Sequence, residues 1–328
     1  MIKVAVLGAG TMGSVHADAY SKMKSVQLVG IVDVRRNVVE PLAERNETIA
    51  FSSFDEMLEK AKPDVIDICL PTYLHRDFVE KAAKAKKHII CEKPIARTLE
   101  QAREMIEITN REGVKLFIAQ VLRFFPEFSK AKELVVNGAI GEVAMVRSMR
   151  GGIFPEAWED WYANYEKCGT LIVDMIIHDF DFMRWCFGEV ERVYAKSQWG
   201  RDLNRMDHAL VSLRFKNGII AHTEGTWAYP EGFMVELEIA GKDGIIHFNS
   251  DDIAPIKSSL RSSKAGIGGV AVPESPLEKN PYQIELEHFI DCIINDKQPI
   301  VTAEDAYKAL EISLAALESV KTGQPVFL

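Results

Sequence analysis

The sequence predicts an α/β fold in two domains: a doubly wound parallel sheet over residues 1–121, then an α+β domain with a large, mostly antiparallel sheet over residues 122–328. Three observations predict it. A chain of 328 residues exceeds the usual domain size of roughly 100 to 200 residues. Apolar runs alternate with amphipathic stretches through the first half, whereas strand-like segments and tight-turn signals dominate the second.

In the first domain, the apolar runs have the length of buried strands. They are Ile2–Leu7, Val26–Val32, Val65–Leu70, His88–Cys91 and Lys115–Ala119. The stretches between them combine helical apolar spacing with charged outer faces. These are Thr11–Met23, Val34–Arg45, Phe54–Ala61, Leu74–Lys84 and Leu99–Glu112. Such alternation is typical of β-α-β units, whose helices cover both faces of a parallel sheet.

The second domain begins with a helix expected over Glu127–Val136, which Asn137-Gly138 ends. Strands are expected at Val143–Met149, Val190–Gln198, His208–Phe215, Ile219–Trp227, Met234–Ala240 and Gly244–Phe248. Lys216-Asn217-Gly218 and Gly241-Lys242-Asp243-Gly244 predict hairpin turns. The sheet is therefore expected to be largely antiparallel.

Three further helices are expected in this domain: Thr170–Phe187, Tyr282–Asn295 and Ala303–Thr322. Ser258–Pro276 is rich in Ser, Gly and Pro, which predicts a mobile surface loop. A broad sheet face that its own helices do not cover would be an apolar patch on a monomer. We therefore expect a homodimer or homotetramer.

Composition excludes several classes of function. A net charge of -9 argues against general binding to nucleic acid or to anionic membranes. Charges interrupt every apolar stretch well short of the roughly 18 residues that span a bilayer, and a strand at residue 2 leaves no room for a secretion segment. The five cysteines contain no CxxC pair, and no HExxH motif is present, so we expect a reduced, cytoplasmic protein without a metal site.

Gly8-Ala9-Gly10-Thr11-Met12-Gly13 is a GxGxxG sequence between the first strand and the first helix. In that context Gly8 makes a tight turn, Gly10 admits a pyrophosphate and Gly13 permits close helix packing. The helix N-terminus adds unpaired N–H groups and a positive dipole end. The pattern predicts a Rossmann domain that binds a dinucleotide.

Asp33 ends the second strand, twenty residues after Gly13, where an acidic side chain can accept hydrogen bonds from the adenosine ribose. This favours NAD. Arg35 and Arg36 leave NADP possible, because an arginine there could bind a 2′-phosphate while Asp33 turned away. A solvated cluster at the start of a helix explains the arginines equally well.

Two groups of residues have chemistry suited to catalysis. Lys93 follows the strand at His88–Cys91, at the sheet edge where ligands bind, and can stabilise charge on a substrate oxygen. Asp174 and His178 are four apart in an apolar helical stretch, so an imidazole base and a supporting carboxylate would share one face. An ordinary surface lysine, and a packed histidine bonded to Asp181, remain the alternatives.

The fingerprint, Thr72–His75, Glu92-Lys93-Pro94 and the run from Asp174 to Asp181 together resemble the glucose-fructose oxidoreductase, inositol dehydrogenase and MocA family. The resemblance spans essentially the whole chain. It implies that Lys93, Asp174 and His178 are the catalytic group. It also implies hydride transfer between a nicotinamide cofactor and a secondary alcohol or ketone of a sugar, inositol or related polyol.

The resemblance also implies binding residues. The cofactor would contact Gly8, Gly10, Thr11, Met12, Gly13, Asp33, Arg35, Leu70, Thr72, His75, Glu92, Lys93 and Gln120. The substrate would contact Lys93, Gln120, Arg123, Trp158, Asp174 and His178. His75 could instead be a cap or packing residue, and Trp158 could belong to an aromatic core. Cys168-Gly169-Thr170 departs from the glycine run frequent in the family, which leaves the substrate open.

Other functions compete with this interpretation. A catalytically silent sensor would use the same two domains to couple dinucleotide or sugar binding to a protein partner. A reductase of another carbonyl or of an imine is also compatible. Tyr20 and Lys24 have the Tyr-x-x-x-Lys spacing of a different dehydrogenase type. We reject that reading, because both are expected to be surface residues far along the first helix.

Overall fold

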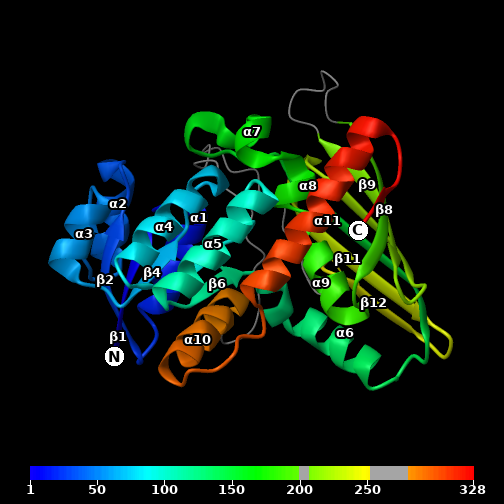
Figure 1. Ribbon diagram of the computed structural model, residues 1–328, viewed down its shortest axis with the longest axis horizontal. Coiled ribbons are helices and arrows are strands. Elements are labelled where there is room, and N and C mark those ends of the chain that lie inside the picture. The colour runs from blue at the N-terminus through cyan, green and yellow to red at the C-terminus, as the bar shows by residue number, and fades with distance from the viewer. Residues whose placement is uncertain (199–206, 252–279) are drawn as a thin grey trace. The chain divides into compact units, whose positions relative to one another are not determined.

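The computed structural model describes residues 1–198, 207–251 and 280–328 (Figure 1). These residues form two compact units, one within Met1–Phe124 and Glu274–Leu310 and the other within Phe125–Pro273 and Glu311–Leu328. The described residues between 280 and 310, which the sequence analysis places in the second domain, therefore pack with the first unit. The loop expected at Ser258–Pro276 lies outside the described residues.

The first unit contains a six-stranded parallel sheet in the order β3-β2-β1-β4-β5-β6. Its strands are β1 (Ile2–Leu7), β2 (Val26–Val32), β3 (Ala50–Phe51), β4 (Val65–Ile68), β5 (His88–Glu92) and β6 (Leu116–Ala119). The direction of winding reverses between β1 and β4. At that point a doubly wound sheet leaves a crevice at the carboxyl ends of its strands. The predicted parallel sheet is confirmed.

The helices of this sheet are α1 (Thr11–Tyr20), α2 (Arg36–Arg45), α3 (Phe54–Ala61), α4 (His75–Lys84) and α5 (Leu99–Glu112). Two short 3-10 turns, η1 (Thr72–Leu74) and η2 (Val121–Phe124), follow β4 and β6. Side-chain caps explain two of the helix starts, because Ser53 and Thr98 accept hydrogen bonds from N–H groups in the first turns of α3 and α5. Helices α4 and α5 pack side by side (Figure 1).

Helix α10 (Pro281–Ile294) completes the first unit, far along the chain. It packs against α1. Its side chains Leu286, Phe289 and Ile290 are buried in the core that the first strands and α1 form. The Phe289 ring stacks on Phe117 of β6 with 5.0 Å between ring centroids. Residues near the end of the sequence are thus part of the Rossmann core.

The second unit contains a seven-stranded sheet in the order β12-β11-β7-β10-β9-β8-β13. Its strands are β7 (Val143–Ile153), β8 (Val190–Ser197), β9 (His208–Phe215), β10 (Ile220–Thr226), β11 (Ala228–Gly241), β12 (Ile245–Asn249) and β13 (Val326–Phe327). Every neighbouring pair is antiparallel except β7 and β10. The mostly antiparallel sheet and both predicted hairpins, β9–β10 and β11–β12, are confirmed.

Helices lie over one face of this sheet (Figure 1). They are α6 (Pro126–Val136), α8 (Thr170–Asp174), α9 (Ile177–Phe187) and the later part of α11 (Ala303–Thr322). The 3-10 turn η3 (Trp158–Ala163) and the short helix α7 (Tyr165–Cys168), which pack on each other, precede α8. Helix α8 packs on β9 and β10, and Phe182 of α9 meets Phe128 of α6 edge to face. In α11, the Ser319 hydroxyl accepts a hydrogen bond from the Ala195 N–H of β8 at 3.0 Å.

The prediction of one helix over Thr170–Phe187 is wrong. The α-helix is interrupted at Met175 and Ile176, where the N–H of Ile176 reaches back five residues to the carbonyl of Leu171. Leu171 and Ile176 pack there against Gly225 of β10, and a Cβ on Gly225 would lie 2.6 Å from Ile176. Close packing on the sheet therefore sets the local geometry, which helical periodicity cannot reveal.

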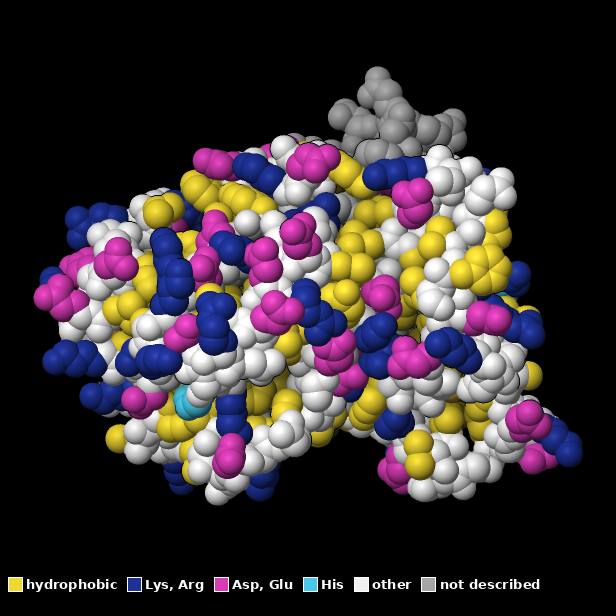
Figure 2. All heavy atoms as spheres, in the orientation of Figure 1, with side chains coloured by type: hydrophobic (Ala, Val, Ile, Leu, Met, Phe, Trp, Pro, Cys, Tyr) yellow, Lys and Arg dark blue, Asp and Glu magenta, His cyan; other side chains and the backbone are white. Residues whose placement is uncertain are grey.

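No helix in the described part of the chain is both long and apolar enough to cross a membrane. Acidic and basic side chains are interspersed over the face seen in Figure 2. Many of them are paired, as in Lys60–Glu56 and Lys84–Glu80.

Candidate active site

The glycine-rich turn between β1 and α1 has the geometry that a dinucleotide requires. Gly8 has φ +97°, and a Cβ there would lie 2.4 Å from the carbonyl oxygen of Cys69. A Cβ on Gly13 would lie 1.8 Å from the carbonyl oxygen of Gly8, so both positions require glycine. A Cβ on Gly10, in contrast, would meet no described atom within 4 Å. The turn is thus tightly packed on its inner side and open at Gly10, as a pyrophosphate cradle needs to be.

The first turn of α1 has donors for an anion. Gly10 is the N-cap, and no side chain caps the helix there. No acidic residue lies in the first turn either. The backbone N–H groups that begin a helix have no partner within it, and they coincide with the positive end of the helix dipole. Thr11, Met12 and Gly13 therefore present donors to a bound phosphate.

Asp33 is held at this turn. Its Oδ2 accepts a hydrogen bond from the Ala9 N–H at 2.9 Å, and the Arg35 guanidinium donates to both of its oxygens at 2.8–2.9 Å. Burial would raise the pKa of Asp33, but the hydrogen bonds from Arg35 and Ala9 and the charge of Arg35 bring that pKa below its ordinary value. Asp33 is thus an anion directed at the turn, and the arrangement in which it turns away from Arg35 is not the one observed.

The segments after β4 and β5 meet at His75. The imidazole is fully buried, with Nδ1 2.9 Å from the Pro94 carbonyl oxygen and Nε2 2.8 Å from the Leu70 carbonyl oxygen. Burial lowers the pKa of His75, although the hydrogen bonds to the Leu70 and Pro94 carbonyls oppose that shift. His75 therefore fixes the Leu70–Thr72 turn to the segment that follows Lys93.

Gln120 and Glu92 end adjacent strands of the same sheet edge. Gln120 is fully buried, and neither atom of its side-chain amide has a hydrogen-bond partner among the described residues. Such an orphaned amide is costly unless a ligand satisfies it. Glu92 is buried, and its Oε2 accepts the N–H of Lys93 at 3.0 Å. The glycine turn, Asp33 and Gln120 together fit a dinucleotide bound along the carboxyl ends of the strands of this sheet.

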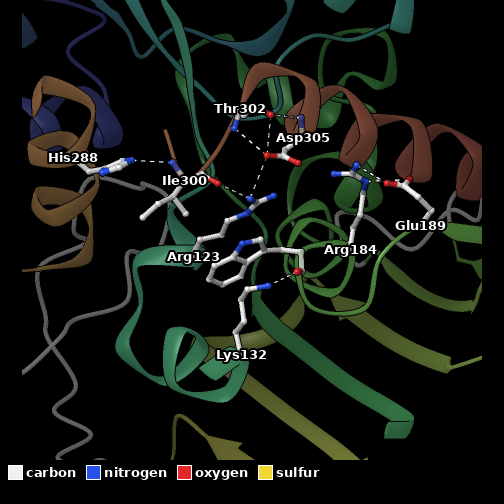
Figure 3. Close-up of polar contacts among 9 residues, drawn as sticks. Arg123, Lys132, Arg184, Glu189, His288, Ile300, Thr302 and Asp305 are labelled. Atoms are coloured by element: carbon white, nitrogen blue, oxygen red, sulfur yellow. Dashed lines mark hydrogen bonds and ion pairs between the residues drawn. The ribbon is translucent and has the colours of Figure 1, made fainter. Parts of the chain in front are cut away.

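Arg123 has partners within its own unit (Figure 3). Its buried guanidinium donates to the Ile300 carbonyl at 2.8 Å and lies 3.3 Å from Asp305 Oδ2. Asp305 also accepts from the N–H and hydroxyl of Thr302, while its own N–H donates to that hydroxyl, which is a capping box at the start of α11. Arg123 thus ties η2 to this helix start, and its contact with a substrate stays a prediction.

Asp174 and His178 lie on either side of the α8–α9 interruption. Asp174 is the last residue of α8 and is buried, and His178 is the second residue of α9 and is half-buried. Since the helix is not continuous between them, the four-residue spacing no longer implies a shared face. Their pairing therefore stays a prediction.

Trp158 is partly exposed in η3, where the next two residues, Glu159 and Asp160, have left-handed φ. It is Trp161 that is buried, stacked on Tyr162 with ring centroids 3.9 Å apart. Gly169, with φ +83°, joins α7 to α8, and Thr170 also has a positive φ of +68°. A β-branched residue in that region is strained, and such strain gathers near functional sites.

Sequence reasoning missed the buried polar residues behind these side chains. Arg150 of β7 pairs with Asp179, next to His178, and both are buried. Asp207 accepts a hydrogen bond from the Leu171 N–H in the first turn of α8 at 3.4 Å. Burial raises the pKa of Asp207. Tyr20, expected at the surface, is buried. The signal that could have found them is a charged or polar residue inside an apolar stretch.

Comparisons with known proteins agree with this geometry. Residues 2–120 match the family model described as "Oxidoreductase family, NAD-binding Rossmann fold", and residues 132–328 match its "C-terminal alpha/beta domain". The myo-inositol 2-dehydrogenase of Thermotoga maritima is 31% identical, over 100% of this chain and 98% of that protein. The scyllo-inositol 2-dehydrogenase (NAD(+)) of Bacillus subtilis is 29% identical, over 100% and 96%.

The fold is likewise that of a solved relative. The crystal structure of a probable dehydrogenase from Thermotoga maritima matches with a TM-score of 0.85 at 30% identity, over 99% of this chain and 98% of that one. These matches confirm the resemblance seen in the motifs. The chain belongs to the glucose-fructose oxidoreductase, inositol dehydrogenase and MocA family of oxidoreductases, and its first domain is an NAD-binding Rossmann domain.

Proposed function

We propose that the protein is an NAD-dependent dehydrogenase that oxidises a secondary alcohol of an inositol, a sugar or a related polyol, and reduces the ketone in reverse. The observation that carries the proposal is the dinucleotide cradle with Lys93 at the end of β5, on the edge where the sheet binds ligands. Relatives named as inositol 2-dehydrogenases support this class of substrate.

The residues divide the work as follows. The glycine turn, the first turn of α1 and Asp33 bind the dinucleotide. The side-chain amide of Gln120 forms hydrogen bonds with the bound ligands. When bound, NAD supplies the nicotinamide carbon that accepts a hydride.

Three side chains act on the substrate. Lys93 donates a hydrogen bond to the reacting oxygen and stabilises negative charge there. His178 takes the hydroxyl proton on its imidazole, and Asp174 stabilises the imidazolium that results. In the direction of reduction, His178 returns that proton to the oxygen.

The test is turnover by the full chain with NAD or NADP and a panel of myo-inositol, scyllo-inositol, other polyols and aldoses. We expect at least one cyclitol or sugar to be oxidised. His178→Ala should lower kcat by about 10² to 10⁴-fold and leave NADH binding intact, because only proton transfer is lost. His247→Ala, which removes an exposed histidine of β12, is the matched control. Binding of NADH without turnover of any panel member would instead favour a sensor.

A further inference from the structure

A cluster of buried polar side chains lies in the first unit, behind the glycine-rich turn. His16 and Tyr20 come from α1, Asp67 from β4, Cys69 from the turn after β4, and Glu92 from the end of β5. Asp67 Oδ2 lies 2.8 Å from His16 Nδ1 and accepts the Tyr20 hydroxyl at 2.8 Å. The other ring nitrogen, His16 Nε2, lies 3.3 Å from Glu92 Oε1. His16 is therefore held between two carboxylates.

This arrangement favours a protonated His16. A neutral ring with its proton on Nδ1 would direct a lone pair at the Glu92 carboxylate, and one with its proton on Nε2 would direct a lone pair at Asp67 Oδ2, which is repulsive in a buried site. Nε2 makes no hydrogen bond, and its 3.3 Å separation from Glu92 Oε1 is the distance of an ion pair when the ring is protonated. An imidazolium, in contrast, is attracted on both sides.

The surrounding groups act in the same direction. Burial would lower the pKa of His16, but Cys69 and Asp67 raise it well above its ordinary value. The Cys69 sulfur lies 3.3 Å from His16 Nδ1; burial and Asp67 raise the pKa of this thiol, and His16 opposes that shift. On the other elements packed here, Cys91 of β5 is a buried thiol, and burial, Asp67, Cys69 and Glu285 of α10 all raise the pKa of Tyr20.

Hydrogen bonds account for the cluster without a metal ion. Ligand atoms of His16, Asp67 and Cys69 lie within 4.8 Å of one another, which is a spacing that a metal could use. However, Tyr20 donates to Asp67 Oδ2 and the Cys69 thiol donates to Asp67 Oδ1 at 3.6 Å. His16 Nδ1 also lies 2.8 Å from Asp67 Oδ2, so both oxygens of the Asp67 carboxylate have hydrogen-bond partners in the protein.

Glu92 connects this cluster to the proposed catalytic lysine. While Oε1 faces His16, Oε2 accepts the backbone N–H of Lys93 at 3.0 Å. We propose that His16, as a buried imidazolium between Asp67 and Glu92, is a positioning residue that fixes the Glu92–Lys93 segment against the cofactor-binding helix α1. This inference rests on the proposed function, because it assigns a purpose to the position of Lys93.

The charge of His16 is measured first. In a long-range ¹H–¹⁵N spectrum of ¹⁵N-histidine-labelled protein at about pH 8, the ring signals absent from His16→Gln should show both nitrogens protonated. At that pH a histidine with the ordinary pKa of about 6.5 is neutral, so protonation of both nitrogens would mark a raised pKa. A neutral ring for His16 at that pH would overturn the proposal, whether or not a substrate has been found.

Kinetics then test positioning. His16→Gln removes the charge and should lower kcat about 10-fold or more with a myo-inositol or other polyol substrate, while the dissociation constant of NADH changes less than about 3-fold. Tyr20→Phe, which removes one hydrogen bond to Asp67 and leaves both His16 contacts, is the matched control and should retain most of kcat. Equal kcat for wild type and His16→Gln would refute positioning.

Stability gives a readout independent of activity. Because the folded pKa of His16 is raised, the charge stabilises the fold fully below the unfolded pKa of about 6.5, and that contribution disappears as pH rises through the folded pKa. The urea midpoint of wild type should exceed that of His16→Gln most at pH 6 and by less at pH 9. If His16→Gln does not fold, Glu92→Gln tests the same point, because losing that carboxylate should lower the His16 pKa. An unchanged His16 titration in Glu92→Gln would contradict the proposal.

Discussion

Asp33 accepts hydrogen bonds from the glycine turn and from Arg35. Its carboxylate would repel a 2′-phosphate, and it can accept hydrogen bonds from ribose hydroxyls. The Arg35 guanidinium is directed at Asp33 and is therefore not free to bind a 2′-phosphate in this arrangement. At this one position, the contact between two side chains determines which dinucleotide fits.

We therefore expect tighter binding of NADH than of NADPH, measured by fluorescence titration. Asp33→Ser should weaken NADH binding about 10-fold or more, because a hydrogen bond to a charged group contributes roughly 1.5–3 kcal/mol. The difference in affinity between NADH and NADPH should become smaller. Asp18→Ser, a change on the exposed side of α1, is the control. Tighter binding of NADPH by wild type would identify Arg35 as a phosphate ligand instead.

Arg150 and Asp179 form a buried ion pair beside His178. Asp179→Asn leaves a buried guanidinium without its counter-charge, which should cost about 3–5 kcal/mol, seen as a lower urea midpoint for the second unit. Replacing both, as in Arg150→Met with Asp179→Leu, should recover much of the loss, since no charge is then buried unpaired. The exposed pair Glu56–Lys60 supplies a control, because Glu56→Gln should change the midpoint little. A midpoint for Asp179→Asn equal to that of wild type would contradict this view of the pair.

At the scale of elements, the β1–α1 turn provides two glycines with opposite roles. Gly10→Ala should fold with nearly wild-type stability, since its backbone is extended and its Cβ meets open space, but it should bind NADH poorly. Gly13→Ala should lower the melting temperature, because its Cβ would collide with the Gly8 carbonyl. Thermal unfolding and NADH titration of the two variants separate these effects, and equal behaviour of both would be inconsistent with the cradle.

The sequence predicted elements well where local pattern decides them. Helices α3, α5 and α11 and strands β1, β2 and β9 have the expected bounds. Strands β3 and β13 were not predicted, because two residues carry no periodicity. The α8–α9 interruption was missed for another reason. Every residue from Leu171 to Ile177 is buried, so the sequence there has no alternation of exposed and buried positions that would indicate where the helix is interrupted.

The candidate site was predictable to the same extent. The GxGxxG turn and Asp33 follow from local sequence and strand order. The buried polar pairs near the site do not, because His16 and Asp67 are 51 residues apart and Arg150 and Asp179 are 29 apart. Such pairs become visible only when the strands are placed side by side.

At the scale of the whole molecule, one face of the second sheet carries exposed apolar side chains within the part of the chain that the structure describes. The strand registers place four apolar side chains on this same face, those of Tyr194, Leu210, Ile220 and Ile245. Their exposed fractions are 37%, 51%, 40% and 60%. We propose that two copies pair through this face, as a homodimer or within a homotetramer.

Light scattering should then give a mass that is a multiple of 36.8 kDa. Leu210→Lys combined with Ile220→Lys should lower the measured mass to that of the monomer, because pairing would bury the two lysine charges in the interface. Val136→Lys, which changes an exposed apolar residue of α6, should leave the mass unchanged. A wild-type monomer at micromolar concentration would rule the pairing out.

Helix α10 has a consequence for the order in which the molecule can be made. The Rossmann core includes Leu286, Phe289 and Ile290, so it is incomplete when residue 124 has been synthesised. At ribosomal rates of about 5–20 residues per second, roughly 10 to 30 s pass before α10 follows. Through that interval the nascent first unit lacks the helix that packs against α1 and Phe117, so apolar side chains that the complete chain buries can contact other chains.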